Sequence, residues 1–219
     1  MTVLSGGRGP DAMAGEMLDI GIGDYRVSAG AHIWALYEAP AKRDAILRSF
    51  VRSALLADDK CICVTDGSPM VRTVMSVGDG DIDVAASSAS GQLELINASD
   101  ITGRSGEFSV SDKIDFWKAA IDRVKVARRH QRIRFVGDMS SALLDASVAG
   151  DVIRFESALN GQLLPLFPQV HMCMYDLDRV AGAFVVDLIS AHPKVYVNDM
   201  LVENPYSMGP EEWLKTIGK

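Results

Sequence analysis

His32-Ile33-Trp34-Ala35-Leu36-Tyr37 is a short apolar run of strand length, and a helical pattern follows it over residues 41–57. The next run, Lys60-Cys61-Ile62-Cys63-Val64-Thr65, again has the length and composition of a buried strand. Between the two runs, one helical stripe is formed by Ile46, Leu47, Phe50, Val51, Ala54 and Leu55. A strand, a helix and a second strand at this spacing predict parallel strands joined by a right-handed crossover.

The rest of the chain continues this alternation of strands and helices. A turn rich in Ser, Ala and Gly is predicted at residues 85–91, and further strands are predicted at 93–96, 132–136, 171–176 and 194–197. Further helices are predicted after an N-cap at Ser111, over the apolar pattern from Val152 to Leu163, and at 181–191. The sequence therefore predicts an α/β fold with a mostly parallel central sheet flanked by helices.

The composition favours one globular domain. The 219 residues are 48% hydrophobic and 23% charged, which is an ordinary mixture for a folded chain rather than a disordered one. The first residues are rich in Gly, Ala and Asp, so we expect a flexible N-terminal segment over residues 1–27. We expect a single domain over residues 28–219.

Charge, apolar runs and cysteine content exclude several functional classes. The formal net charge of -7 argues against direct binding to nucleic acid. The longest apolar runs, such as residues 181–186, are far shorter than the roughly 20 residues that a membrane helix needs. No secretory signal is visible, and an odd set of three cysteines does not make a disulfide framework. We therefore expect a cytoplasmic protein with no membrane or nucleic-acid contact.

Polar residues follow several predicted strands at their carboxyl ends. They are Tyr37-Glu38, Thr65-Asp66, Gly137-Asp138-Met139-Ser140 and Tyr175-Asp176. Ligands of open α/β sheets bind at this edge, so acids, hydroxyls and aromatic rings here suit a small polar ligand or a cation. The alternative is structural, because Asp often starts a turn or caps a helix after a strand. The sequence leaves both interpretations open.

The segment after the first strand argues against ATP hydrolysis. An ATPase with this sheet would carry a glycine-rich loop there, whose backbone N–H groups and lysine bind phosphates. The chain instead has Glu38-Ala39-Pro40-Ala41-Lys42-Arg43-Asp44, and the motif GxxxxGK[ST] does not occur. Pro40 also removes a backbone donor. We therefore expect no functional P-loop and no cofactor, although Lys42 and Arg43 could still attract an anion.

Histidine and cysteine together raise the question of a metal site, and we expect none. His32, Cys61, Cys63 and Cys173 have side chains that suit zinc. We expect Cys61 and Cys63 to point to opposite faces of their strand, which would prevent them from sharing one ion, and we interpret the thiols as buried structural groups. No GxSxG or HExxH motif occurs, so no catalytic residue is assigned, and His192 is interpreted as structural.

Eight short motifs occur in an order that resembles the MEDS domain, the methanogen/methylotroph DcmR-type sensory domain. They are His32-Ile33-Trp34 with Tyr37, Cys61-Ile62-Cys63 in a strand ending in Thr65-Asp66, Gly91-Gln92-Leu93, Arg134 to Ser140, Phe155-Glu156 with Leu159-Asn160, Cys173-Met174-Tyr175-Asp176, His192-Pro193 and Asn204-Pro205-Tyr206. The resemblance covers residues 28–207. A second cysteine at Cys63 and the bulk of Trp34 depart from the family pattern, which affects the expected size of the pocket.

The resemblance implies a ligand-sensing domain, proposed to recognise small hydrocarbon derivatives, with a RecA/KaiC-like three-layer sandwich that lacks a functional P-loop. On this basis we expect a non-enzymatic sensor that binds a small molecule and regulates a protein partner of the sensor-kinase, anti-sigma or transcription-factor type. Two alternatives stay open: a residual nucleotide-binding protein or atypical ATPase, and an interaction module without a ligand. Self-association stays open as well.

The strand ends and the resemblance together imply a ligand pocket. Its expected residues are His32, Trp34, Tyr37, Cys61, Thr65, Asp66, Arg134, Asp138, Glu156, Cys173 and Tyr175. Within this set we interpret Arg134, Asp138 and Glu156 as a polar support for the ligand. A strand arginine that points inward needs an acidic partner. Asp138 is four residues away but beyond the turn at Gly137, so we predict that Arg134 bonds to Glu156 on the apolar side of its helix. A buried ion pair without a ligand role would give the same pairing.

Overall fold

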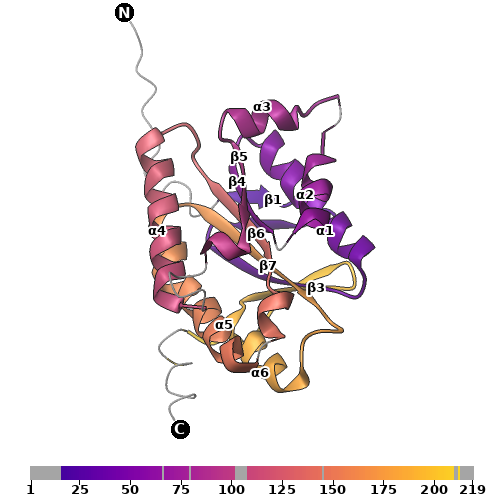
Figure 1. The fold of residues 1–219 in the computed structure, drawn as a ribbon, viewed down its shortest axis with the longest axis vertical. Helices are drawn as coiled ribbons and strands as arrows, with labels where there is room; N and C mark the ends of the chain where they lie inside the picture. The colour runs from indigo at the N-terminus through magenta and orange to yellow at the C-terminus, as the bar shows by residue number, and fades with distance from the viewer. Residues whose placement is uncertain are drawn as a thin grey trace, which may run out of the picture.

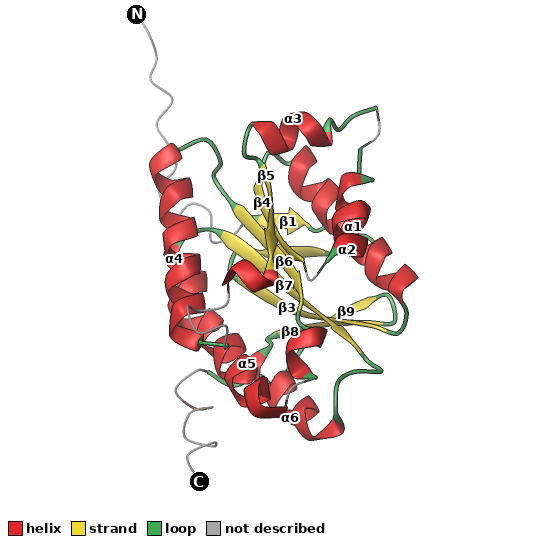
Figure 2. Ribbon diagram, in the orientation of Figure 1, coloured by secondary structure: helices red, strands yellow, loops and turns green. Residues whose placement is uncertain are grey.

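The computed structural model describes residues 16–65, 67–78, 80–101, 108–144, 146–209 and 212, and within them a single large sheet forms the centre of the molecule (Figures 1 and 2). Its seven strands lie in the order β5-β4-β6-β7-β3-β8-β9. They are β3 (Ala31–Tyr37), β4 (Lys60–Thr65), β5 (Leu93–Asn97), β6 (Ile133–Asp138), β7 (Gln169–Asp176), β8 (Lys194–Val197) and β9 (Met200–Glu203). All neighbouring strands are parallel except β8 and β9, which confirms the predicted α/β class.

Helices cover both faces of this sheet (Figure 2). One layer holds α1 (Pro40–Leu56), α2 (Ser68–Met75) and α3 (Val84–Ala89), and the other holds α4 (Val110–Ala127), α5 (Ala146–Ala158) and α6 (Gly182–Ala191). Each layer buries its own hydrophobic cluster against the sheet, as expected for a three-layer α/β sandwich. None of the helices in the described part of the chain combines the length and apolar character required to span a bilayer.

A small hairpin, β1 (Met17–Asp19) with β2 (Arg26–Ser28), was missed by the sequence analysis. Residues 16–27 were predicted to be flexible, yet the side chains of Leu18, Ile20, Ile22 and Val27 are buried in the cluster beneath the α1–α3 layer. The hairpin lies so close to α1 that a Cβ on Gly21 would stand 2.2 Å from the carbonyl oxygen of Ser49. Residues 1–15 of the predicted segment lie outside the described residues.

Two local predictions differ from the structure at element boundaries, and two elements were not predicted. Most of the turn predicted at residues 85–91 is α3, because Asp83 caps it by accepting a hydrogen bond from the backbone of Ala86 at 2.9 Å. The cap of α4 is Ser109 rather than Ser111, and its hydroxyl accepts from the backbone N–H of Asp112 at 3.2 Å. Helix α2 and strand β9 have no counterpart among the predicted elements.

The pleat of the central strands decides which side chains meet. The face toward the α4–α6 layer carries His32 and Trp34 of β3 and Cys173 and Tyr175 of β7. The alternate residues of β3, including Tyr37, face the α1–α3 layer. The parallel register sets His32 beside His171 and Trp34 beside Cys173. This register brings ring and sulfur side chains from two strands together beneath α5.

Candidate functional site

A buried polar cluster, which we call the Glu156 cluster, consists of His32, Glu156, Cys173, Tyr175 and His192. Oε2 of Glu156 lies 3.1 Å from Nε2 of His32, 3.1 Å from the sulfur of Cys173 and 3.5 Å from Nε2 of His192. Its other oxygen, Oε1, accepts a hydrogen bond of 2.5 Å from the hydroxyl of Tyr175. The histidine and glutamate side chains are completely buried, so a carboxylate stands in the hydrophobic core under α5.

Burial and mutual contacts shift the titration of this cluster. Burial raises the pKa of Glu156, but its interactions with the nearby His192 and His32 outweigh burial and hold that pKa well below its usual range. Burial, together with the nearby His192, lowers the pKa of His32. Burial and the charge of Glu156 raise the pKa values of Cys173 and Tyr175. The cluster therefore keeps a charged carboxylate in a buried site.

Both imidazoles are fixed from outside the cluster. Nδ1 of His32 lies 3.1 Å from Oδ1 of Asn160, whose amide nitrogen donates to the carbonyl of Ala191 at 2.7 Å. Asn160 sits in a π-helical turn, Leu159–Leu163, that follows α5, and such turns often mark functional positions. Nδ1 of His192 lies 2.7 Å from the carbonyl oxygen of Leu188. These contacts direct both Nε2 atoms toward Glu156.

An apolar cavity of about 60 Å³ lies next to the cluster, between the sheet and helices α4 and α5. Cys173 lines this cavity and belongs to the Glu156 cluster at the same time, so the two sites share one side chain. Most of the wall is aromatic or aliphatic, contributed by Val64, Trp117, Phe135, Met139, Phe155 and Leu159. Its other polar side chains are His171, whose pKa burial lowers far below the ordinary value, and Lys113, whose pKa burial also lowers.

A second polar group stands at the carboxyl ends of the strands, as predicted from the sequence. The hydroxyl of Tyr37 donates to Oδ2 of Asp138 at 2.5 Å, and the hydroxyl of Ser140 donates to Oδ1 at 2.5 Å. The backbone N–H of Asp176 donates to Ser140 at 2.7 Å, which ties in a third strand end. Burial and the hydrogen bond to Asp138 raise the pKa of Tyr37. Asp66, also predicted for this edge, lies outside the described residues.

The predicted bond between Arg134 and Glu156 is wrong. The guanidinium of Arg134 donates from Nε to Oδ2 of Asp59 at 2.7 Å, and Arg132 donates to the other oxygen of Asp59 at 2.7 Å. Arg134 alternates with Phe135 along β6, so it faces the α1–α3 layer while Glu156 lies in the opposite one. The arginine prediction correctly required an acid but named one on the other side of the sheet.

The predicted separation of Cys61 and Cys63 is also wrong. Their sulfur atoms lie 3.8 Å apart, and both side chains are buried in the cluster beneath the α1–α3 layer. Residues two apart in a strand share a face, so this arrangement follows from the pleat. Thr65 continues the same row, and its hydroxyl lies 3.5 Å from the carbonyl of Ile96. Neither Cys61 nor Thr65 contacts the Glu156 cluster among the interactions of the described residues.

The structure thus divides the predicted site residues into separate groups. His32, Trp34, Glu156, Cys173 and Tyr175 come together, and the Trp34 ring stacks on His192 with centroids 5.8 Å apart. Tyr37 and Asp138 form the group at the strand ends, whereas Cys61, Thr65 and Arg134 lie elsewhere on the α1–α3 face. His192 is the residue that sequence reasoning assigned to structure alone. The one feature of the sequence that pointed to His192 as a functional residue was the motif His192-Pro193, which is part of the family resemblance.

The chain matches the model of a known family of sensory domains. The model of the MEDS family, described as the MEthanogen/methylotroph, DcmR Sensory domain, matches residues 31–193. A comparison with curated proteins finds no match. The matched region spans β3 to the residue after His192, and so contains the whole Glu156 cluster and the residues that line the cavity. Since it covers well over half of the 219 residues, the chain belongs to the MEDS family of sensory domains.

Proposed function

We propose that this sensory domain binds one small, largely apolar molecule in the cavity beside Cys173 and reports its presence to a regulatory protein. The observation that carries this proposal is the cavity itself, because its walls are mostly aromatic and aliphatic, with Cys173, His171 and Lys113 as the polar side chains. Ligand sites of this type use apolar walls for affinity and a few polar atoms for orientation. The domain acts without catalysis of its own.

The size of the cavity limits the ligand. A cavity of about 150 Å³ accommodates benzene, whereas one water molecule occupies about 30 Å³ of liquid. A space of about 60 Å³ therefore suits a molecule of only a few heavy atoms. Burial keeps the imidazole of His171 neutral, which favours an uncharged ligand. These features favour a one- to few-carbon hydrocarbon derivative with a halogen or oxygen substituent.

Helix α4 connects the cavity to the surface. Lys113 and Trp117 line the cavity from the first half of α4, while Val126, near its end, is 83% exposed. A ligand that widens the cavity would move α4 away from the sheet. The exposed part of the helix would then present this displacement to a partner. We propose a partner of the sensor-kinase, anti-sigma or transcription-factor type, with the domain in the cytoplasm.

Nucleotide binding at the start of α1 is less well supported. Helix α1 begins at Pro40, and the N-cap residue Ala39 offers no side-chain cap. The two cations of this turn already have acidic partners: Lys42 donates to Asp199 at 2.5 Å, and Arg43 donates to Asp44 at 2.8 Å. A phosphate at this position would compete with both pairs.

The test of ligand binding uses thermal unfolding with a panel of halogenated and oxygenated hydrocarbons of one to four carbons. A true ligand at about 100 times its Kd should stabilise the protein by about 2.7 kcal/mol. The Val64→Phe variant fills the cavity and should lose this response, while Val202→Phe on the exposed edge strand β9 should keep it. If no compound shifts the melting temperature of the wild type, or if Val64→Phe responds like the wild type, the cavity is not the sensing site.

A further inference from the structure

We propose that the Glu156 cluster binds a single divalent metal ion of the zinc type. The ligands are Nε2 of His32, Nε2 of His192, the sulfur of Cys173 and Oε2 of Glu156. These four atoms come from β3, α5, β7 and the residue that ends α6, and all lie within 4.8 Å of one another. The proposal stands on this geometry and does not rest on the proposed sensing function.

The distances between the ligand atoms match a tetrahedral zinc site. Zinc bonds of about 2.0–2.1 Å to nitrogen or oxygen and about 2.3 Å to sulfur place neighbouring ligand atoms about 3.3–3.6 Å apart at a tetrahedral angle. The sulfur of Cys173 lies 3.5 Å from Nε2 of His32 and 3.1 Å from Oε2 of Glu156. The two Nε2 atoms lie 3.1 and 3.5 Å from the same carboxylate oxygen. Small side-chain movements complete the tetrahedron.

The hydrogen bonds outside the cluster set the histidine tautomers that a metal requires. The carbonyl of Leu188 can only accept, so Nδ1 of His192 carries the proton. The amide nitrogen of Asn160 is used on Ala191, which leaves its oxygen to accept from Nδ1 of His32. In each neutral imidazole Nε2 then presents a lone pair to the cluster. Such oriented histidines are characteristic of metal sites.

Without a cation, the only donor that the described residues place near those lone pairs is the weak Cys173 thiol, which lies 3.5 Å from Nε2 of His32 and also bonds to Glu156. Nε2 of His192 is a buried atom without a hydrogen-bond partner, and a lone pair of Nε2 on His32 faces a carboxylate oxygen. Protonating both rings would place two imidazolium ions with centroids 4.2 Å apart in a site without solvent, which is costly. A metal ion satisfies both nitrogen atoms at once.

Charge and ligand type select the metal. When the ion binds, the Cys173 thiol releases its proton to solvent, and the thiolate and the Glu156 carboxylate together carry two negative charges. A divalent ion therefore leaves the buried site neutral. Sulfur and imidazole ligands favour zinc over magnesium or calcium, which prefer oxygen. Among the described residues, Cys61 and Cys63 belong to no comparable group, although their sulfur atoms are adjacent.

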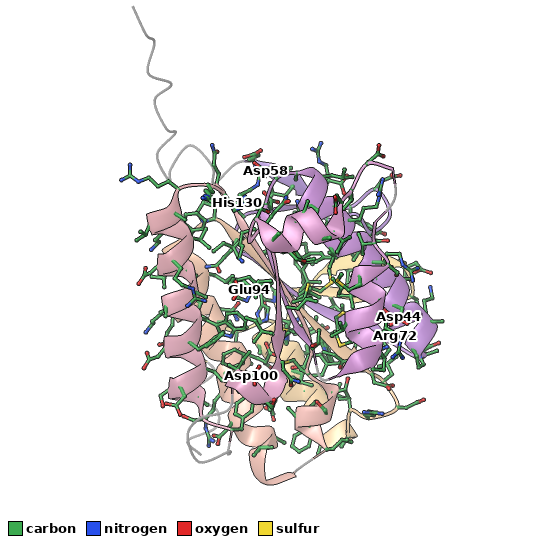
Figure 3. The ribbon with its side chains drawn as sticks, turned by 45° about the horizontal axis from the view of Figure 1, so that its top comes forward. Asp44, Asp58, Arg72, Glu94, Asp100 and His130 are labelled. Atoms are coloured by element: carbon green, nitrogen blue, oxygen red, sulfur yellow. The ribbon has the colours of Figure 1, made fainter. Side chains whose placement is uncertain are left out.

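The first experiment measures metal in the full chain, expressed with zinc in the medium and purified without chelator. We expect about one zinc per chain in the wild type and less than about a tenth in Cys173→Ala and His192→Gln. Two controls should retain full occupancy: Cys63→Ala, a buried cysteine on the other face of the sheet, and His130→Gln, whose ring lies beside Asp58 near the top of the view in Figure 3 and is not among the grouped ligand residues.

A second measurement keeps the proposal testable if the cluster variants fail to fold. Wild-type protein is stripped with a chelator and titrated with Co²⁺, whose visible and near-ultraviolet spectrum reports tetrahedral geometry and a sulfur ligand. We expect one equivalent to give a tetrahedral spectrum with a thiolate charge-transfer band. Wild-type protein that carries less than about a tenth of an equivalent of zinc and gives no such spectrum would overturn the proposal. Equal loss of metal in the His130→Gln control would do so too, because it would indicate surface binding.

Discussion

His32 and His192 lie with their ring centroids 4.2 Å apart, and both direct Nε2 toward the same oxygen of Glu156. One ring comes from the second residue of strand β3 and the other from the C-cap residue that follows α6. The charged carboxylate between them lies inside a hydrophobic core. Burial of a charge there costs free energy unless its partners are retained. The stability and the chemistry of this domain therefore depend on the same few side chains.

Removal of the carboxylate should be strongly destabilising. Glu156→Ala leaves the hydroxyl of Tyr175 and the thiol of Cys173 without their shared acceptor, so we expect a loss of about 3–5 kcal/mol in the free energy of unfolding. Glu203→Ala, which removes an exposed acid on β9, should cost at most about 1 kcal/mol. Urea denaturation measures both, and similar losses in the two variants would show that the cluster does not stabilise the core.

The arginine on the other side of the sheet gives an independent prediction. Asp59→Ala removes the carboxylate that binds both Arg134 and Arg132, and it leaves the fully buried Arg134 without its acid. We expect this variant to lose about 3–5 kcal/mol in the free energy of unfolding. Lys42→Ala breaks an exposed pair and should change stability little. An Asp59→Ala variant as stable as Lys42→Ala would contradict the assigned pairing.

Stability should fall as the pH falls, in two ranges. The pKa values of His32 and His171 are lowered from 6.5 in the folded chain, so below about pH 6.5 the unfolded chain binds protons that the folded chain does not. The pKa of Glu156 is lowered from 4.5, so its contribution is present above about pH 4.5 and is lost as the pH falls toward the folded pKa.

Urea unfolding between pH 8 and pH 4, with a chelator present, tests this pH dependence. His171→Phe should reduce the slope below pH 6.5 by up to about 1.4 kcal/mol per pH unit, the value for one proton. A wild-type stability that stays constant between pH 7 and pH 5 would disprove the assignment of buried neutral histidines.

The orienting amide offers a test that is separate from folding. Asn160→Ala removes the acceptor that holds Nδ1 of His32 but leaves the four metal ligands in place. We expect Co²⁺ affinity to fall by about 10- to 100-fold while the thiolate band remains. Asn97→Ala at the exposed end of β5 is the matched control and should bind as the wild type does. Unchanged affinity in Asn160→Ala would show that His32 is not oriented by this amide.

The sequence predicted the elements that have clear periodicity. The apolar runs containing His32, Cys61 and Cys173 became parallel strands, and membership in the MEDS family was inferred from short motifs. Helical stripes such as the one ending at Leu55 predicted α1 for the same reason, because burial of one face imposes its period on the sequence.

The incorrect predictions concern contacts that depend on the order of the strands and on the face of the sheet that a residue occupies. Arg134 needed an acid, but only the order β4-β6-β7 and the turn before β4 show that Asp59 is the one within reach. Cys61 and Cys63 share a face because they are two residues apart, which the sequence analysis assigned incorrectly. His192 reaches the cluster through a long-range contact with His32, which no periodic pattern shows, and only the family motif His192-Pro193 drew attention to the residue.

Native mass spectrometry shows directly whether the cavity beside Cys173 binds a ligand, because it counts the molecules bound per chain. The protein is incubated with the compound that stabilises it most, and the wild type is compared with Val64→Phe and Val202→Phe. We expect one bound molecule per chain in the wild type and in Val202→Phe, and none in Val64→Phe. No adduct on the wild type, or equal occupancy in Val64→Phe, would contradict a sensing cavity beside Cys173.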